Sequence, residues 1–185
     1  MTDGRQPLFS TPRGSARGGV PDDELRTAWS GWLGSLRAHG LDPSPVLRPG
    51  AAPTMLAAAE QEIGTALPED VRALYALCDG QEDPDEVGGP VLFPAHAFCS
   101  LARGLDAWRA GAPGAGWPLA GDDRGHLLRI ELGSPGGRVL ADGDERPREL
   151  APDLVTYLGL LAHARLELPD ARASGDAAWD APTLR

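Results

Sequence analysis

The chain has 185 residues, 42% hydrophobic and 24% charged, a composition typical of a globular protein that needs no disulfide or metal to fold. Its 17 basic residues, all arginine, oppose 27 acidic residues, so the formal net charge is −10. Nucleic acids and anionic membranes require a positive surface, so both are disfavoured as partners. The charge suits a basic partner, or it serves solubility alone.

Targeting signals and disulfides are not expected. Residues 1–20 carry arginines but no apolar stretch of a secretory signal, and no apolar run approaches the roughly 18 residues of a membrane span. A cytoplasmic location follows as the expectation. Cys78 and Cys99 are far apart and lack metal-ligand spacing, so we expect reduced thiols in the core.

A single domain is predicted over residues 21–168. Residues 1–20 are rich in Gly, Ser, Pro and Arg and are predicted to form a flexible tail. Residues 169–185 are predicted to form a second tail, from which Trp179 and Leu184 could dock onto the body.

The first helix is predicted from about Asp23 to His39, with Asp22 or Asp23 as the cap and Gly40 as the stop. Its apolar residues recur at helical spacing. They are Leu25, Trp29, Trp32, Leu33 and Leu36. The two tryptophans face either the core or a partner, and we favour the core.

A proline-rich linker, residues 41–53, precedes a second helix that is predicted from Thr54, as N-cap, to Ile63. Met55, Ala59 and Ile63 follow one another at steps of four residues. We therefore expect these three side chains to form its apolar face.

A third helix is predicted to open at Pro68, with Glu69 and Asp70 in a first turn that favours acids, and to end at Gly80. Its inward side chains recur at helical spacing. They are Val71, Leu74, Tyr75 and Cys78.

An acidic loop follows the third helix, with five acids in eight residues and no basic residue among them. The acids are Asp79, Glu82, Asp83, Asp85 and Glu86. Short strands are candidates at Pro90–Phe93 and Phe98–Leu101. Alternatively, Ser100 caps a short helix over Leu101–Ala110.

Strand patterns dominate the next part of the chain. Trp117–Ala120 is extended, His126–Leu132 alternates apolar and charged residues, and Arg138–Ala141 returns after a glycine-rich turn. A last helix is predicted over about Pro152–Leu166. Helices first, then strands and a closing helix, predict an α+β fold with a small, mostly antiparallel sheet.

No convincing catalytic, metal or cofactor motif is found. The four histidines are scattered singly, and Gly133–Gly137 lies between strands, whereas a phosphate loop precedes a helix. Asp142–Glu145 lacks the ligand spacing of a calcium loop. Asp122 and Asp123 could serve acid–base chemistry, but adjacent acids beside glycine usually form turns.

One run of residues resembles a known family. Residues 60–80 read EQEIGTALPEDVRALYALCDG, with a Leu-Pro pair that opens a helix and an Asp-Gly pair that ends it. Trp117-Pro118, the turn at 122–125 and the following apolar strand add to the pattern. Together with the closing helix, these features resemble the SUKH superfamily over about residues 54–166, and the first helix fits as an N-terminal extension.

The resemblance implies a protein-binding domain and not an enzyme, and we expect no cofactor. Bacterial SUKH proteins are typically immunity proteins that block secreted toxins, often nucleases, whose basic surfaces would attract an acidic antidote. We hypothesise that the five loop acids form part of the binding face, and the alternative is a solvated loop. Two other functions stay open: a regulatory or scaffold module, as in the fungal branch, and an enzyme whose site is assembled only by folding.

Overall fold

The computed structural model describes residues 21–111, 116–133, 137–142 and 147–164. Both predicted tails lie outside the described residues. The last helix is shorter than predicted: Asp153 caps its start, and it ends at His163, because Ala164 is already extended.

The described strands form one five-stranded antiparallel sheet, whose spatial order β1-β2-β3-β4-β5 follows the sequence. The strands are β1 (Ala97–Phe98), β2 (Trp117–Gly121), β3 (Leu127–Ile130), β4 (Val139–Ala141) and β5 (Arg148–Ala151). In the central strand, Ile130 pairs with Trp117 on one side and with Val139 on the other. All three side chains are buried.

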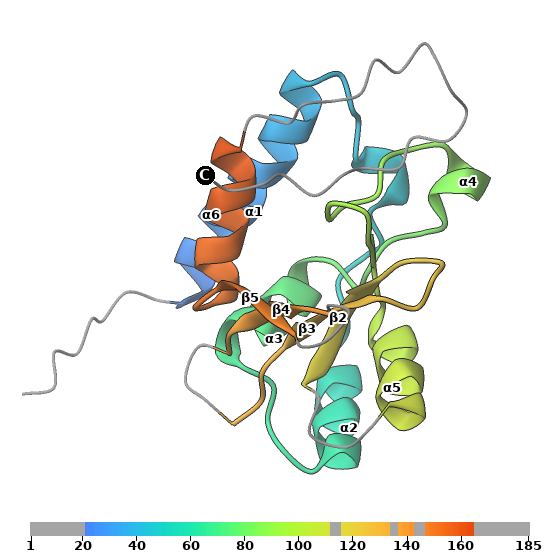
Figure 1. Ribbon diagram of the computed structural model, residues 1–185, viewed down its shortest axis with the longest axis vertical. Helices are drawn as coiled ribbons and strands as arrows, with labels where there is room; N and C mark the ends of the chain where they lie inside the picture. Colours follow the sequence, from blue (N-terminus) through green and yellow to red (C-terminus); the bar gives the residue numbers. More distant parts are fainter. Residues whose placement is uncertain (1–20, 112–115, 134–136, 143–146, 165–185) are drawn as a thin grey trace, which may run out of the picture.

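Helices surround this sheet (Figure 1). They are α1 (Pro21–Ala38), α2 (Pro53–Ile63), α3 (Glu69–Leu77), α4 (Pro84–Val87), α5 (Leu101–Ala110) and α6 (Leu154–His163), with a 3-10 turn, η1, at Ser44–Val46. Figure 1 shows α1 and α6 side by side, and α2 and α5 together at the opposite end. The predicted α+β class and the N-terminal helix are confirmed.

The apolar stripe of α1 faces the core. Leu25, Trp29 and Trp32 are all buried, and the Trp32 indole donates a 2.8 Å hydrogen bond to the carbonyl oxygen of Leu92. The preference for a core role of the two tryptophans is therefore confirmed. The predicted stripe of α3 is confirmed as well, because all four of its side chains are buried.

The second helix differs from its prediction at its start. It begins at Pro53 after Ala52, so Thr54 lies inside the first turn and is not the N-cap. The predicted apolar face is wrong at one residue: Met55 is 45% exposed, and the buried side chains are Leu56 and Ala59. Proline at the first helical position explains the earlier start, because its fixed φ suits a helix and no amide is lost there.

The segment around residues 90–101 also differs from one prediction. Pro90–Phe93 forms no strand but leads into a tight turn in which Phe93 pairs with His96. Ser100 caps α5 by accepting the amide of Arg103 at 3.3 Å, which settles the helix alternative for Leu101–Ala110. Strand β5 was missed, because its short, partly exposed sequence does not alternate.

Within the described residues, no helix combines the length and the apolar character that a membrane span requires.

Candidate protein-binding surface

The start of the acidic loop is held between two other segments. On one side it runs beside the linker: the amide of Asp79 donates to the Pro49 carbonyl at 3.1 Å, and the amide of Glu82 donates to the Val46 carbonyl at 2.8 Å. On the other side, the amide of Gln81 donates to the carbonyl of Phe98 in β1 at 3.0 Å. The loop therefore leaves the body of the protein at a fixed place.

Asp79 points inward and supports the fold. Its side chain is 7% exposed, and its Oδ1 accepts the amide of Leu101, the first residue of α5, at 2.8 Å. The next residue, Gly80, has φ +77° and leaves no room for a side chain, because a Cβ there would lie 2.3 Å from the Ser100 nitrogen. The Asp79-Gly80 pair thus joins the end of α3 to the start of α5.

The other four predicted acids lie toward the surface. Glu82 is half-buried and forms an ion pair with Arg48 at 3.1 Å. Asp83 is exposed and caps α4 by accepting the amide of Asp85 at 2.9 Å. Asp85 and Glu86 are exposed and form no ion pair within the part of the chain that the structure describes.

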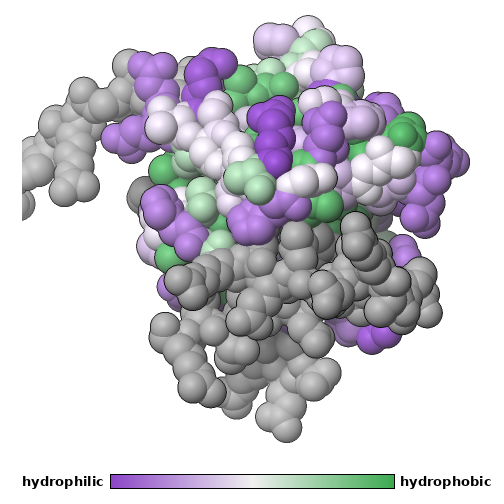
Figure 2. Space-filling view, turned by 90° about the horizontal axis from the view of Figure 1, so that it is seen from above, coloured by the Kyte–Doolittle hydropathy of each residue, from purple (hydrophilic) through white to green (hydrophobic). Residues whose placement is uncertain are grey.

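Helix α4 presents these acids together with an apolar side chain. It lies at the edge of the molecule in Figure 1, and Val87, its last residue, is 43% exposed. Figure 2 shows hydrophilic side chains gathered at its right-hand edge, the side on which α4 lies in Figure 1, with a hydrophobic one beside them. The surface is acidic with an apolar spot. Acids and aliphatic groups in this mixture suit a basic protein surface.

Asp42 extends this acidic surface and was missed in the sequence. It is exposed just before η1, which packs against α4. The Ser44 amide donates to its Oδ1 at 3.0 Å, and this hydrogen bond holds the pKa of Asp42 below its ordinary value. A separation of about forty residues hides the link from a sequence pattern, because only folding brings η1 and α4 together.

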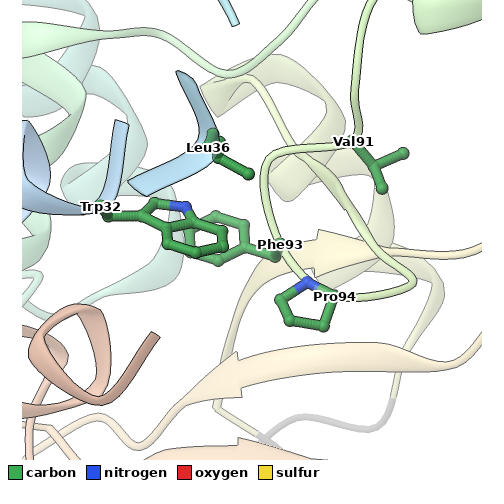
Figure 3. A pocket seen from close by; sticks show the side chains of 5 residues that line it. All are labelled: Trp32, Leu36, Val91, Phe93 and Pro94. Atoms are coloured by element: carbon green, nitrogen blue, oxygen red, sulfur yellow. The ribbon is translucent and has the colours of Figure 1, made fainter. Parts of the chain in front are cut away.

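A small apolar depression lies beside the same loop (Figure 3). Trp32 and Leu36 of α1 form one wall, and Val91, Phe93 and Pro94 form the other. Trp32, Leu36 and Phe93 are almost completely buried. The depression is therefore the outer rim of the core, where α1 closes against the loop that follows α4.

The residues that the sequence offers for acid–base or metal chemistry have structural roles. Asp122 accepts the amides of Arg124 and His126 at 2.9 and 2.8 Å, as expected of a turn former, and its other oxygen pairs with the His126 ring at 2.8 Å. Cys78 and Cys99 are buried free thiols, and burial raises the pKa of Cys78 to about 11. The described residues contain no group of three or more metal-ligating side chains.

Comparison with known families gives one match. The model of the SMI1 / KNR4 family (SUKH-1) matches residues 50–159, more than half of the chain. The matched segment contains the acidic loop and the whole sheet, and leaves out α1, η1 and the linker up to Pro49. No curated protein matches the chain.

Proposed function

Because the chain belongs to the SMI1 / KNR4 family (SUKH-1), we propose that it is a protein-binding domain that acts as an immunity protein against a secreted toxin. Its binding face would include Glu82, Asp83, Asp85 and Glu86, with Asp79 holding the loop from inside. A toxin that acts on nucleic acid carries a basic surface, which complements this face.

The observation that carries the proposal is the unpaired charge on α4. Elsewhere in the described chain acids are often neutralised by arginine, as Glu62 is by Arg109 at 2.6 Å. Asp85 and Glu86 keep their charge unopposed on a helix at the edge of the molecule. Exposed charges of one sign mainly accelerate the encounter with a complementary partner, and they do so less at high salt.

The first experiment tests whether a toxin-like domain is encoded beside this protein and, where one is, co-expresses the two and measures their binding at low and high salt. The absence of such a neighbour would favour a regulatory module. We expect rescue of growth and an association rate that falls steeply as salt is added. A toxin that binds without any dependence on salt would contradict the acidic face. No binding would favour a regulatory module, and turnover of a substrate would favour an enzyme.

Charge reversal locates the face. We expect Asp85→Arg/Glu86→Arg to slow association at least tenfold at low salt, because two attractive charges become repulsive. The matched control is Asp23→Arg/Glu24→Arg, which makes the same charge change on two exposed, consecutive acids in the first turn of α1. Equal effects of the two variants would show that net charge acts alone and that α4 is no contact site.

A further inference from the structure

The acidic loop is closed at its neck by one buried side chain. Gln81 is 3% exposed, and its Oε1 accepts two amides at 2.9 Å, those of Leu92 and Phe98. The first bond joins Gln81 to Leu92, so residues 82–91, which include α4 and four of the five acids, are enclosed between these two residues. The second bond ties this neck to β1.

Nothing else in the described hydrogen bonding fixes the loop between its ends. The bonds made by residues 83–91 stay within that segment, such as the amide of Gly88 to the carbonyl of Pro84 at 2.9 Å. The loop is therefore attached through Glu82 at one end and Leu92 at the other. Packing against η1 also restrains the loop, since α4 contacts η1 and Gly89 lies so close to Val46 that a Cβ would come within 2.7 Å of its Cγ1.

Only the oxygen of the Gln81 amide is used. The oxygen must face the two backbone donors, and this fixes the orientation of the amide. The Nε2 group is then buried without a hydrogen-bond partner among the described residues. A buried donor left unpaired destabilises the folded state. Gln81 therefore contributes to the loop through its oxygen alone, which accepts both hydrogen bonds.

We propose that Gln81 is the positioning residue of the binding surface: it closes the loop so that α4 presents its acids in one arrangement before the partner arrives. This inference rests on the proposed function. A loop that is already ordered loses less entropy on binding, which raises affinity without any contact from Gln81 itself. The partner it fits is a rigid basic surface of matching shape.

The test compares two substitutions at this position. Gln81→Leu removes the acceptor of both hydrogen bonds, and we expect about tenfold weaker binding of the neighbouring toxin-like domain, because the opened loop must then be ordered when the partner binds. Gln81→Glu retains an oxygen for each amide, and we expect affinity close to that of the wild type. Asp153→Ala, which removes the cap of α6, is the control for lost stability and should leave affinity unchanged.

A second measurement needs neither a partner nor a variant. We expect the Leu92 and Phe98 amides of the wild-type protein to exchange with solvent as slowly as those of the central strand β3. Fast exchange of both would overturn the inference, as would a folded Gln81→Leu protein that binds like the wild type. If the wild type does not bind the toxin-like domain, the proposed function fails, whereas the exchange result still decides whether Gln81 closes the loop.

Discussion

Three buried residues of this protein are linked by two successive hydrogen bonds. The Trp117 indole donates to the Tyr75 hydroxyl at 3.1 Å, and that hydroxyl donates to the Cys99 carbonyl at 3.2 Å. All three residues are buried. The chain links α3, β2 and the segment after β1, so one hydroxyl joins three parts of the core.

We expect Tyr75→Phe to lower the free energy of unfolding by about 1–3 kcal/mol, because it leaves the Trp117 donor and the Cys99 carbonyl unpaired in the interior. Urea denaturation measures the change. Tyr157→Phe is the matched control, since Tyr157 is also buried but its hydroxyl has no hydrogen-bond partner in the described structure. A similar loss for both variants would show that the chain of hydrogen bonds contributes nothing.

At the scale of elements, the turn between Phe93 and His96 is the strained one. Ala95 has φ +59°, the only described non-glycine residue with a positive φ. The Phe93 carbonyl accepts the His96 amide at 3.0 Å, which fixes Ala95 at the third position of the turn. Glycine adopts this conformation without steric cost, whereas alanine does not.

We expect Ala95→Gly to raise the free energy of unfolding by about 1 kcal/mol. The same substitution at Ala58, exposed in the middle of α2, should lower it by about the same amount, because glycine disfavours a helix. Thermal denaturation of the two variants gives the signs. Destabilisation by both substitutions would mean that the turn relaxes enough to accept alanine.

The elements that sequence reasoning located well are those with a strong period. Helices α1 and α3 carry large apolar side chains every three or four residues, and their buried faces were predicted correctly. In α2, by contrast, the middle of the helix is a run of alanines and the two large apolar residues before it are adjacent, so the pattern could not tell Met55 from Leu56. Strand β5 is too short and too exposed to show a period of two.

The candidate site, too, could be predicted from the sequence only in part. The sequence shows where acids gather, but not which of them are free. Asp79 accepts a hydrogen bond inside the fold, and Glu82 forms an ion pair with Arg48. Asp42, in the linker, lies near the same surface because η1 packs against α4. Gln81 carries no charge and no motif, and its role depends on two amides that are 11 and 17 residues away along the chain. Such roles arise from tertiary contacts, which a local pattern cannot contain.

At the scale of the whole molecule, two aspartates make opposite contributions to the change of folding stability with pH. Burial raises the pKa of Asp70, whose Oδ2 accepts the Leu154 amide at 3.0 Å and so joins α3 to α6. Burial alone would also raise the pKa of Asp122, but hydrogen bonds from the His126 ring and from backbone amides hold it below its ordinary value.

The sign of each contribution follows. A raised pKa contributes stability that is present below the unfolded-state pKa and is lost as pH rises through the folded-state pKa. Asp70→Asn should therefore gain on the wild type as pH rises above the ordinary pKa of an aspartate, about 4. Asp122 contributes stability above its unfolded-state pKa, and this is lost as pH falls through the lower folded-state pKa. Asp122→Asn should therefore lose stability relative to the wild type as pH rises toward the ordinary pKa of an aspartate, about 4. Chemical denaturation at pH values on either side of this pKa would contradict the assignment if both differences changed in the same direction.

Helix α1 lies outside the segment matched by the family model, yet it completes the core of the protein. Trp29 packs edge-on against Phe98 at 6.3 Å, and the Trp32 indole bonds to the Leu92 carbonyl. At the other end, the match stops at residue 159, in the middle of α6, which packs against α1. A fragment of residues 50–159 would lack α1, would expose the core side chains that Trp29 and Trp32 cover, and would end inside α6. The segment that the family model matches and the segment that the packed core requires therefore have different limits in this chain.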